Sequence, residues 1–317
     1  MKSIKFSRFK KKSLILLQKL IDPDLLAKKI KNRKLSQALQ TINLTKGIKE
    51  EGKLGKNTKN LFPMIMLMSD NILLGNTKKE GLKIWDLTTG KCIKKLQEPL
   101  LYVDQLLKIN ENIFVSTSYQ GLSINIWDLR TGNCLKTLEG HRFKISSKLL
   151  KLNEFQIVSG SCDRTMKIWD LRTGNCIKTL VGYSDYVSFI LKMKEKKIIS
   201  GHDRGSIKIW NITAGNCIRT LREHYSITYG ISNLLKINEN KIVSCEHNEL
   251  IIWDLLTGKP IKNHDYWGAR YRILLKINKN KFVSNFKNFI KIWDSETGIC
   301  INKLQAHREG RVYGVCV

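Results

Sequence analysis

One sequence pattern returns six times along this chain, and it constrains the fold more than any other feature. Each copy places a tryptophan before Asp or Asn, then a short turn and a run of mixed apolar and polar residues. The six tryptophans are Trp85, Trp127, Trp169, Trp210, Trp253 and Trp293. Successive tryptophans are 42, 42, 41, 43 and 40 residues apart. A period of about 40 to 45 residues indicates a repeat protein whose units stack to bury a shared core.

Each repeat is typical of four short β-strands, as the third copy shows. Residues 148–161 contain two apolar runs that are separated by a polar turn at Asn153–Glu154. The next run, 166–169, alternates as a half-buried strand does. Thr173–Gly174 then provides a tight turn, in which glycine supplies a positive φ, and 176–180 forms the fourth run. The sequence therefore predicts an all-β propeller of six complete four-stranded blades.

The same residues resemble a known family. The third copy carries the fullest signature, namely Gly140–His141, Ser159–Gly160, Asp163 and Trp169–Asp170. From about residue 61 to 317 the chain resembles the WD40-repeat proteins. In that family a His, a Ser or Thr, an Asp and the Trp form a buried, hydrogen-bonded tetrad that stabilises the blade. The resemblance assigns this structural role to His141, Ser159, Asp163 and Trp169.

The other copies depart from this pattern. The position 14 residues after each repeated tryptophan holds Pro99, His141, Tyr183, His224, Trp267 and His307. A clear tetrad Asp is absent from copies one, two, five and six, and Asp203 in copy four stands one place early. We therefore expect most blades to be held by apolar packing and ladder hydrogen bonds alone, with the third blade held best.

The two ends of the chain differ from the repeats. Residues 311–317 have the character of the first strand of a seventh, incomplete copy. Either the ring closes with six blades, or its edges stay exposed. Residues 1–60 are rich in Lys and Arg, and the apolar spacing from Leu25 to Ile42 predicts a helical extension before a polar linker. This extension either has no function of its own or docks a partner or an anionic surface.

Composition narrows the class of protein. The formal net charge of +29 favours a polyanion partner, but lysine dominates it and a compositional bias toward Lys, Asn and Ile explains it equally well. No apolar run is long enough to span a membrane, and no signal peptide is evident, so we expect a cytoplasmic protein, with a nuclear location as the alternative. Five cysteines follow the repeat and are expected as packed residues of outer strands: Cys92, Cys134, Cys176, Cys217 and Cys300.

Function is expected to depend on surface loops rather than on catalysis. The sequence contains no phosphate-binding, hydrolase or metal-binding motif, so we predict no enzyme activity, no cofactor and no metal. His202, beside Asp203, is expected to lie exposed in a hairpin turn. The connections between successive blades are rich in the residue types of interaction hot spots. The candidate partner-binding residues are Tyr102, Arg142, Phe143, Tyr183, Tyr186, Tyr225, Tyr266, Trp267, Arg270 and Arg308.

Three functions remain open from the sequence. The first is a scaffold or adaptor that binds protein or peptide partners through one face of the propeller. The second is a basic protein associated with RNA or the ribosome, whose binding would depend strongly on salt. The third is a substrate receptor of a ubiquitin ligase. Trp267 separates two hypotheses for the binding face, because it either fills the position of a missing tetrad His or anchors a partner.

Overall fold

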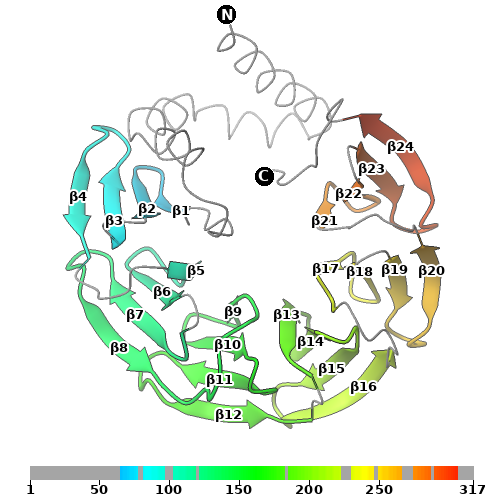
Figure 1. Cartoon of the computed structure of the whole chain (residues 1–317), viewed down its shortest axis with the longest axis horizontal. Coiled ribbons are helices and arrows are strands. Elements are labelled where there is room, and N and C mark those ends of the chain that lie inside the picture. Colours follow the sequence, from blue (N-terminus) through cyan, green and yellow to red (C-terminus); the bar gives the residue numbers. More distant parts are fainter. Residues whose placement is uncertain are drawn as a thin grey trace, which may run out of the picture. The chain divides into compact units, whose positions relative to one another are not determined.

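The computed structural model describes residues 65–77, 81–96, 103–118, 121–182, 185–222, 230–245, 249–265, 274–286 and 289–305. These residues form six four-stranded antiparallel sheets, and in each sheet the strands follow one another in chain order (Figure 1). The chain divides into two compact units. The described residues up to Thr179 belong to the N-terminal unit, and those from Leu180 belong to the C-terminal unit.

The N-terminal unit contains the first three sheets. The first sheet consists of β1 (Ile65–Ser69), β2 (Ile72–Thr77), β3 (Gly81–Asp86) and β4 (Cys92–Lys95). The second consists of β5 (Val103–Lys108), β6 (Ile113–Ser118), β7 (Ile124–Asp128) and β8 (Cys134–Leu138). The third consists of β9 (Leu150–Lys151), β10 (Gln156–Gly160), β11 (Met166–Asp170) and β12 (Cys176–Leu180). The strands predicted around each tryptophan are confirmed.

The C-terminal unit repeats this plan in the last three sheets. The fourth sheet consists of β13 (Val187–Lys192), β14 (Lys197–His202), β15 (Ile207–Asn211) and β16 (Asn216–Arg222). The fifth consists of β17 (Asn233–Lys236), β18 (Lys241–Cys245), β19 (Glu249–Asp254) and β20 (Pro260–Asp265). The sixth consists of β21 (Leu274–Lys276), β22 (Lys281–Phe286), β23 (Phe289–Asp294) and β24 (Cys300–Gln305).

Burial is greatest in the two middle strands of each sheet. In the third sheet, β10 and β11 are mostly buried, whereas β12 is exposed at all but two positions. Middle strands have a neighbour on each side and a sheet against their faces, so apolar side chains on them bury the most area. Five of the six repeated tryptophans are fully buried, and Trp85 is only partly buried.

The Asp or Asn after each tryptophan closes the turn to the fourth strand. In the second sheet, Oδ1 of Asp128 accepts hydrogen bonds from the amides of Arg130 at 2.7 Å and Thr131 at 3.3 Å. The amide of Gly132 then donates to the Asp128 carbonyl at 2.8 Å. Gly132 has a φ of 75°, a conformation that costs glycine little. The Thr-Gly turn predicted from the sequence is confirmed.

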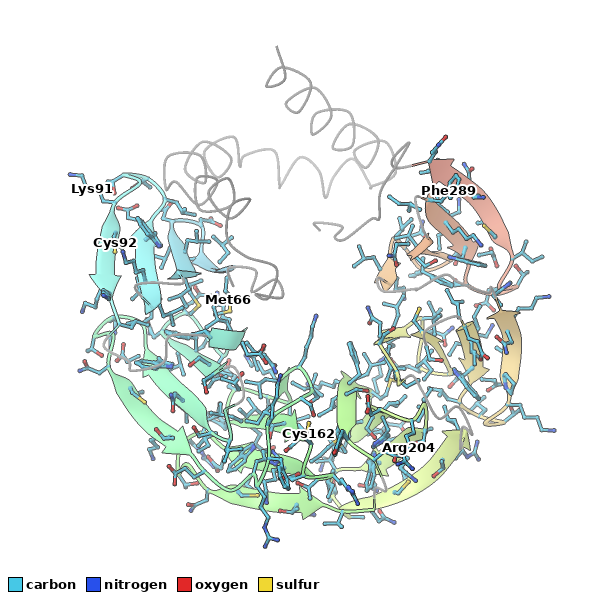
Figure 2. All side chains as sticks on the ribbon, viewed as in Figure 1. Met66, Lys91, Cys92, Cys162, Arg204 and Phe289 are labelled. Carbon is cyan, nitrogen blue, oxygen red and sulfur yellow. The ribbon has the colours of Figure 1, made fainter. Side chains whose placement is uncertain are left out.

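The repeat cysteines lie on outer strands as predicted, but they are not packed there. Cys92, Cys134 and Cys176 are exposed free thiols, and Cys217 and Cys300 are partly exposed. Figure 2 shows Lys91 and Cys92 at the outer start of β4. Each thiol donates to the carbonyl two residues later, at 3.5 Å in Cys92. The prediction failed because the fourth strand is an edge strand, with no further strand beside it to bury these side chains.

Lysine and arginine side chains join neighbouring sheets within each unit. Lys94, on β4, donates to the carbonyl oxygens of Arg130 and Thr131 in the next sheet, at 3.1 and 2.7 Å. Arg219, on β16, makes the same contact with the fifth sheet. On the first strands, Lys108, Lys151 and Lys276 donate to a carbonyl oxygen of the preceding sheet. Part of the large positive charge therefore serves the junctions between sheets.

Two predicted segments lie outside the described residues. These are the helical extension expected over residues 1–60 and the seventh-copy strand expected over residues 311–317. Both stay predictions.

Candidate functional site

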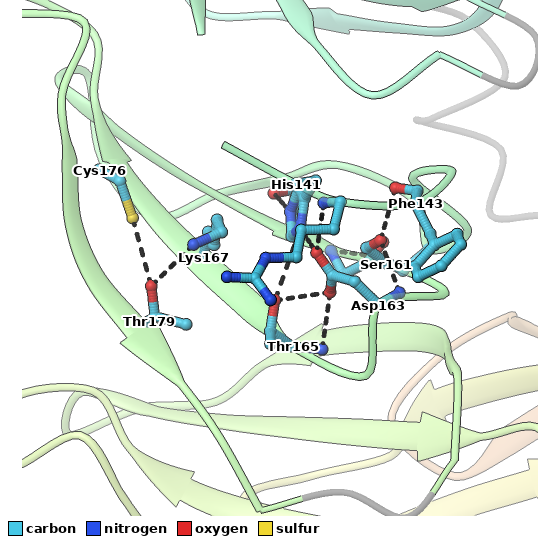
Figure 3. Close-up of polar contacts among 12 residues, drawn as sticks. His141, Phe143, Ser161, Asp163, Thr165, Lys167, Cys176 and Thr179 are labelled. Atoms are coloured by element: carbon cyan, nitrogen blue, oxygen red, sulfur yellow. Dashed lines mark hydrogen bonds and ion pairs between the residues drawn. The ribbon is translucent and has the colours of Figure 1, made fainter. Parts of the chain in front are cut away.

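Four buried side chains of the third sheet form a continuous chain of hydrogen bonds. Trp169, on β11, donates its indole Nε1–H to Oγ of Ser159 on β10, at 2.8 Å. Ser159 donates its hydroxyl to Nε2 of His141, at 2.7 Å. His141, in the connection before β9, donates Nδ1–H to Oδ2 of Asp163, at 2.7 Å (Figure 3). The direction of donation is fixed, because a carboxylate only accepts and an indole N–H only donates.

The ionisation of this chain follows from its burial and its partners. Burial lowers the pKa of His141 and outweighs the hydrogen bond and charge of Asp163, which raise it, so the ring is neutral near pH 7. Burial alone would raise the pKa of Asp163, but hydrogen bonds from Thr165, His141 and Arg142 bring it below its usual value. A carboxylate with several donors is stable where an isolated one would not be.

This arrangement is suited to structure rather than to nucleophilic chemistry. Ser, His and Asp in series are also the components of a hydrolytic triad. Here Ser159 is fully buried, and its oxygen already accepts the indole N–H of Trp169. A nucleophile must reach its substrate, and this hydroxyl faces only protein. The hydrogen-bond chain therefore connects the core tryptophan to the loop that carries Asp163.

The same aspartate fixes the connection that precedes β9. Oδ2 of Asp163 accepts the amide of Arg142 at 3.0 Å, and Oγ of Ser161 donates to the carbonyl of Phe143 at 2.7 Å (Figure 3). The amide of Cys162 donates to the carbonyl of Lys144 at 2.9 Å. The backbone is therefore tied at three successive residues, while the side chains of Arg142 and Phe143 remain exposed, Phe143 by 62%.

Residues 132–170 match the WD40 family model described as "WD domain, G-beta repeat". All four members of the hydrogen-bonded chain fall within this segment, and the surrounding sheets repeat its strands six times along the chain. Residues 132–170 therefore match one WD repeat, and the six sheets are those of a WD-repeat β-propeller.

A solved structure shares the fold of this protein. It is the crystal structure of the computationally designed Ika8 protein, with a TM-score of 0.66 and 28% sequence identity. The likeness covers 78% of this chain and 74% of that chain. No curated protein matches the sequence. The fold predicted from the repeats is therefore confirmed as that of a WD-repeat β-propeller with six four-stranded sheets.

Other sheets of this protein keep a shorter version of the polar chain. An indole Nε1–H donates to a serine Oγ in the pairs Trp127–Ser116, Trp210–Ser200, Trp253–Ser244 and Trp293–Ser284. These distances are 2.8 to 2.9 Å. The prediction that most blades rely on apolar packing and ladder bonds alone is therefore wrong. It overlooked the serine because only complete tetrads were sought.

The fourth sheet brings in a histidine from an unexpected position. His202 is the last residue of β14 and is fully buried, so its prediction as an exposed turn residue is wrong. Its Nε2 lies 3.0 Å from Oγ of Ser200, which accepts the indole N–H of Trp210. Burial lowers the pKa of His202 to about 3, against a hydrogen bond from the ring to the backbone of Asp185 that raises it. The signal was a histidine two residues after the serine, on the same face of the strand.

The first sheet lacks the serine. Leu73 pairs with Trp85 as Ile157 pairs with Trp169, so Gly75 stands where the third sheet has Ser159. The buried indole nitrogen of Trp85 has no hydrogen-bond partner among the described residues. The amine of Lys83 instead lies over the ring of Trp85, at 5.6 Å from the ring centre, in a cation–π contact.

The structure places three of the ten candidate partner-binding residues. Arg142 and Phe143 lie together in the connection before β9, and exposed Tyr186 lies just before β13 in the other unit. The carbonyl of Tyr186 accepts the amide of Asp203 at 3.0 Å. The remaining candidates lie outside the described residues: Tyr102, Tyr183, Tyr225, Tyr266, Trp267, Arg270 and Arg308. Both hypotheses for Trp267 therefore stay predictions.

The described residues contain no group of three or more His, Cys, Asp or Glu side chains that could hold a metal ion. Nor do they contain a helix with the length and hydrophobicity that a membrane span requires.

Proposed function

We propose that this WD-repeat protein is a non-catalytic scaffold that binds a protein or peptide partner through the connection of residues 141–145. WD-repeat propellers are generally protein-interaction scaffolds and are typically not enzymes. The observation that carries the proposal is the direct bond from the buried Asp163 to the amide of Arg142. A core hydrogen-bond chain thus fixes a loop whose Arg and Phe side chains point into solvent.

Physical chemistry supports binding at such a loop. A loop that is ordered before binding loses little conformational entropy when a partner arrives. Arginine and large aromatic residues contribute most to interface hot spots. Phe143 and Arg142 offer an apolar surface beside a charge, which suits a protein epitope. The exposed thiols of the outer strands fit a reducing compartment, and we include a cytoplasmic location in the proposal.

Affinity purification of the full chain, followed by mass spectrometry, tests this proposal. Phe143→Ala is compared with Phe155→Ala, because Phe155 is also exposed, by 50%, but lies at the opposite end of the same sheet. We expect Phe143→Ala to lose a protein partner that the wild type and Phe155→Ala retain at high salt. Retention by both variants contradicts the proposal.

The salt series separates the remaining functions. The basic-protein alternative predicts that the chain captures RNA or ribosomes, that this binding falls steeply as salt rises, and that neither Phe143→Ala nor Phe155→Ala changes it. Recovery of ubiquitin-ligase subunits through residues 1–60 would identify the third alternative.

A further inference from the structure

The outer rim of the fifth and sixth sheets carries exposed apolar side chains where the other sheets carry polar ones. Leu256, in the turn between β19 and β20, is 68% exposed. The equivalent residues of the other sheets are Thr88, Arg130, Arg172, Thr213 and Glu296. Ile299, just before β24, is 59% exposed. Its equivalents are Lys91, Asn133, Asn175, Asn216 and Lys259.

Repetition within one chain shows that the fold does not require these apolar residues. The same turn forms with Arg130, Arg172 or Thr213 in the place of Leu256, and the amide of each donates to the Asp or Asn side chain two residues earlier, as the Leu256 amide does. In the monomer, a leucine or isoleucine side chain that is mostly exposed buries little apolar area and therefore adds little to the free energy of unfolding. Leu256 and Ile299 therefore call for an explanation outside the fold.

The two residues belong to one continuous strip of the C-terminal unit. Arg219, on β16, donates to the carbonyl of Leu256 at 2.7 Å. Farther along, His264 Nε2, on β20, donates to the carbonyl of Gly298 at 2.7 Å, and the end of β20 lies beside the start of β24 (Figure 1). A Cβ added to Gly298 would lie 3.1 Å from Cβ of Lys262. Each outer strand is thus in contact with the turn of the next sheet.

Further exposed aliphatic residues lie at these contacts between neighbouring sheets. Ile218 precedes Arg219, and Ile261 precedes Lys262, so each lies at one of the two junctions. Both are exposed, as is Ile301 on β24. An aliphatic residue at this site is common to all six outer strands, where it sits at a β-bulge in the sheets whose register is described. Only the rim of sheets five and six adds Leu256 and Ile299 to it.

The side chains beside this strip carry positive charge. Lys259 and Lys262 are exposed, and neither forms an ion pair with another described residue. Of the described acidic groups nearby, Asp254 and Asp294 accept turn amides and Glu296 pairs with Lys241. An apolar strip flanked by exposed lysines is complementary to a segment that combines aliphatic and acidic side chains.

We infer that the rim formed by Ile218, Leu256, Ile261, Ile299 and Ile301 docks an acidic amphipathic segment of a partner protein. Its aliphatic side chains cover Leu256 and Ile299, and its carboxylates pair with Lys259 and Lys262. This surface is distinct from the loop of residues 141–145, so the inference does not rest on the proposed function.

Binding of a labelled synthetic peptide to the full chain tests the inference by fluorescence polarisation. The probe spaces leucine and glutamate so that a helix would carry them on separate faces. One control peptide replaces each leucine by serine, and another replaces each glutamate by lysine. We expect saturable binding of the Leu/Glu peptide alone. The double variant Leu256→Thr with Ile299→Asn, which installs residues found in the fourth sheet, should bind it at least about tenfold more weakly.

Two control variants make the result specific. Ile93→Thr removes an exposed aliphatic residue from the first sheet and should bind as the wild type does. Phe143→Ala should also bind normally, so a failure here and a failure of the proposed function are distinguishable. The double variant should keep the wild-type melting temperature, because other sheets carry its residues.

Three outcomes would overturn the inference. One is the absence of saturable binding, and another is equal binding by the double variant and the wild type. The third is a dimer of the wild type in analytical ultracentrifugation that becomes a monomer in the double variant, since the rim would then bind a second copy of this chain.

Discussion

The third and first sheets of the N-terminal unit have the same strand order, the same tryptophan and the same closing turn. They differ in the partner of the tryptophan indole N–H. In the third sheet the indole N–H of Trp169 begins a hydrogen-bond chain that reaches Asp163 and the amide of Arg142. In the first sheet Gly75 replaces the serine, and the indole nitrogen of Trp85 has no partner among the described residues.

The difference separates two tasks that the repeat performs. Apolar residues at fixed spacing and the Asp-Thr-Gly turn are present in both sheets, and they suffice for four paired strands. Of the two sheets, only the third has the polar chain, which ties a surface loop to the core. The apolar frame thus forms the paired strands, and the polar chain adds a connection between the core and the loop.

The largest effect at neutral pH is expected from Asp163→Ala. This substitution leaves the His141 ring N–H and the amides of Arg142 and Thr165 without their acceptor. Unsatisfied buried donors cost about 1 to 3 kcal/mol of unfolding free energy. Denaturant titration measures the loss, with Asp203→Ala as the control in the exposed turn of the fourth sheet. Equal stability of both variants would show that the hydrogen-bond chain does not stabilise the third blade.

Acid should lower stability through His202 in the fourth sheet, by an amount that is small near neutrality and grows as the pH falls. Its pKa is about 3 in the folded protein, against an ordinary value of 6.5, so only the unfolded state takes up a proton between these values. Stability is therefore complete above pH 6.5 and falls as the pH drops toward 3. One proton contributes a slope of up to about 1.4 kcal/mol per pH unit.

His202→Gln tests this dependence, since glutamine is polar but does not titrate. The unfolding free energy of the variant should change less with pH between neutrality and mild acid than that of the wild type. His264→Gln is the comparison, because His264 is less buried, and it should flatten the curve less. Parallel curves for the wild type and His202→Gln would contradict the burial of His202.

The smallest effect is expected from Gly75→Ser, which gives the first sheet the serine that it lacks. Gly75 lies within β2, so a serine there can present Oγ to Trp85 as Ser159 does to Trp169. One added hydrogen bond is worth about 1 kcal/mol. Thermal unfolding should show a higher melting temperature than the wild type, and Gly75→Ala separates the hydroxyl from the added carbon. No gain of Ser over Ala would contradict the pairing.

The sequence predicted the six sheets because their determinants are local and repeated. Strand alternation, the turn glycine and the tryptophan at a fixed period recur in every copy, so each copy supports the others. The members of the polar chain in the third sheet were also named from the sequence, through resemblance. Their contacts in the structure are those expected of a tetrad.

Other features depend on contacts that the sequence does not display. His202 was misplaced because a His-Asp pair near a glycine is typical of a turn, and only the buried position of Ser200 shows that the ring turns inward. The cysteines were expected to be packed because the burial of an edge strand depends on what lies beside it. The lysine bridges between sheets join residues 36 to 42 positions apart, so a net charge could not reveal them.

The central claim is that the polar chain holds the third sheet more firmly than the apolar frame holds the first. Hydrogen exchange at the indole N–H groups measures this directly in the native protein, because each tryptophan gives its own signal after labelling with nitrogen-15 and assignment by Trp→Phe variants. Trp169 should exchange most slowly of the six repeat tryptophans, and Trp85 most rapidly. Asp163→Ala should speed exchange at Trp169 and leave Trp85 unchanged. Equal rates at Trp169 and Trp85 in the wild type would contradict the claim.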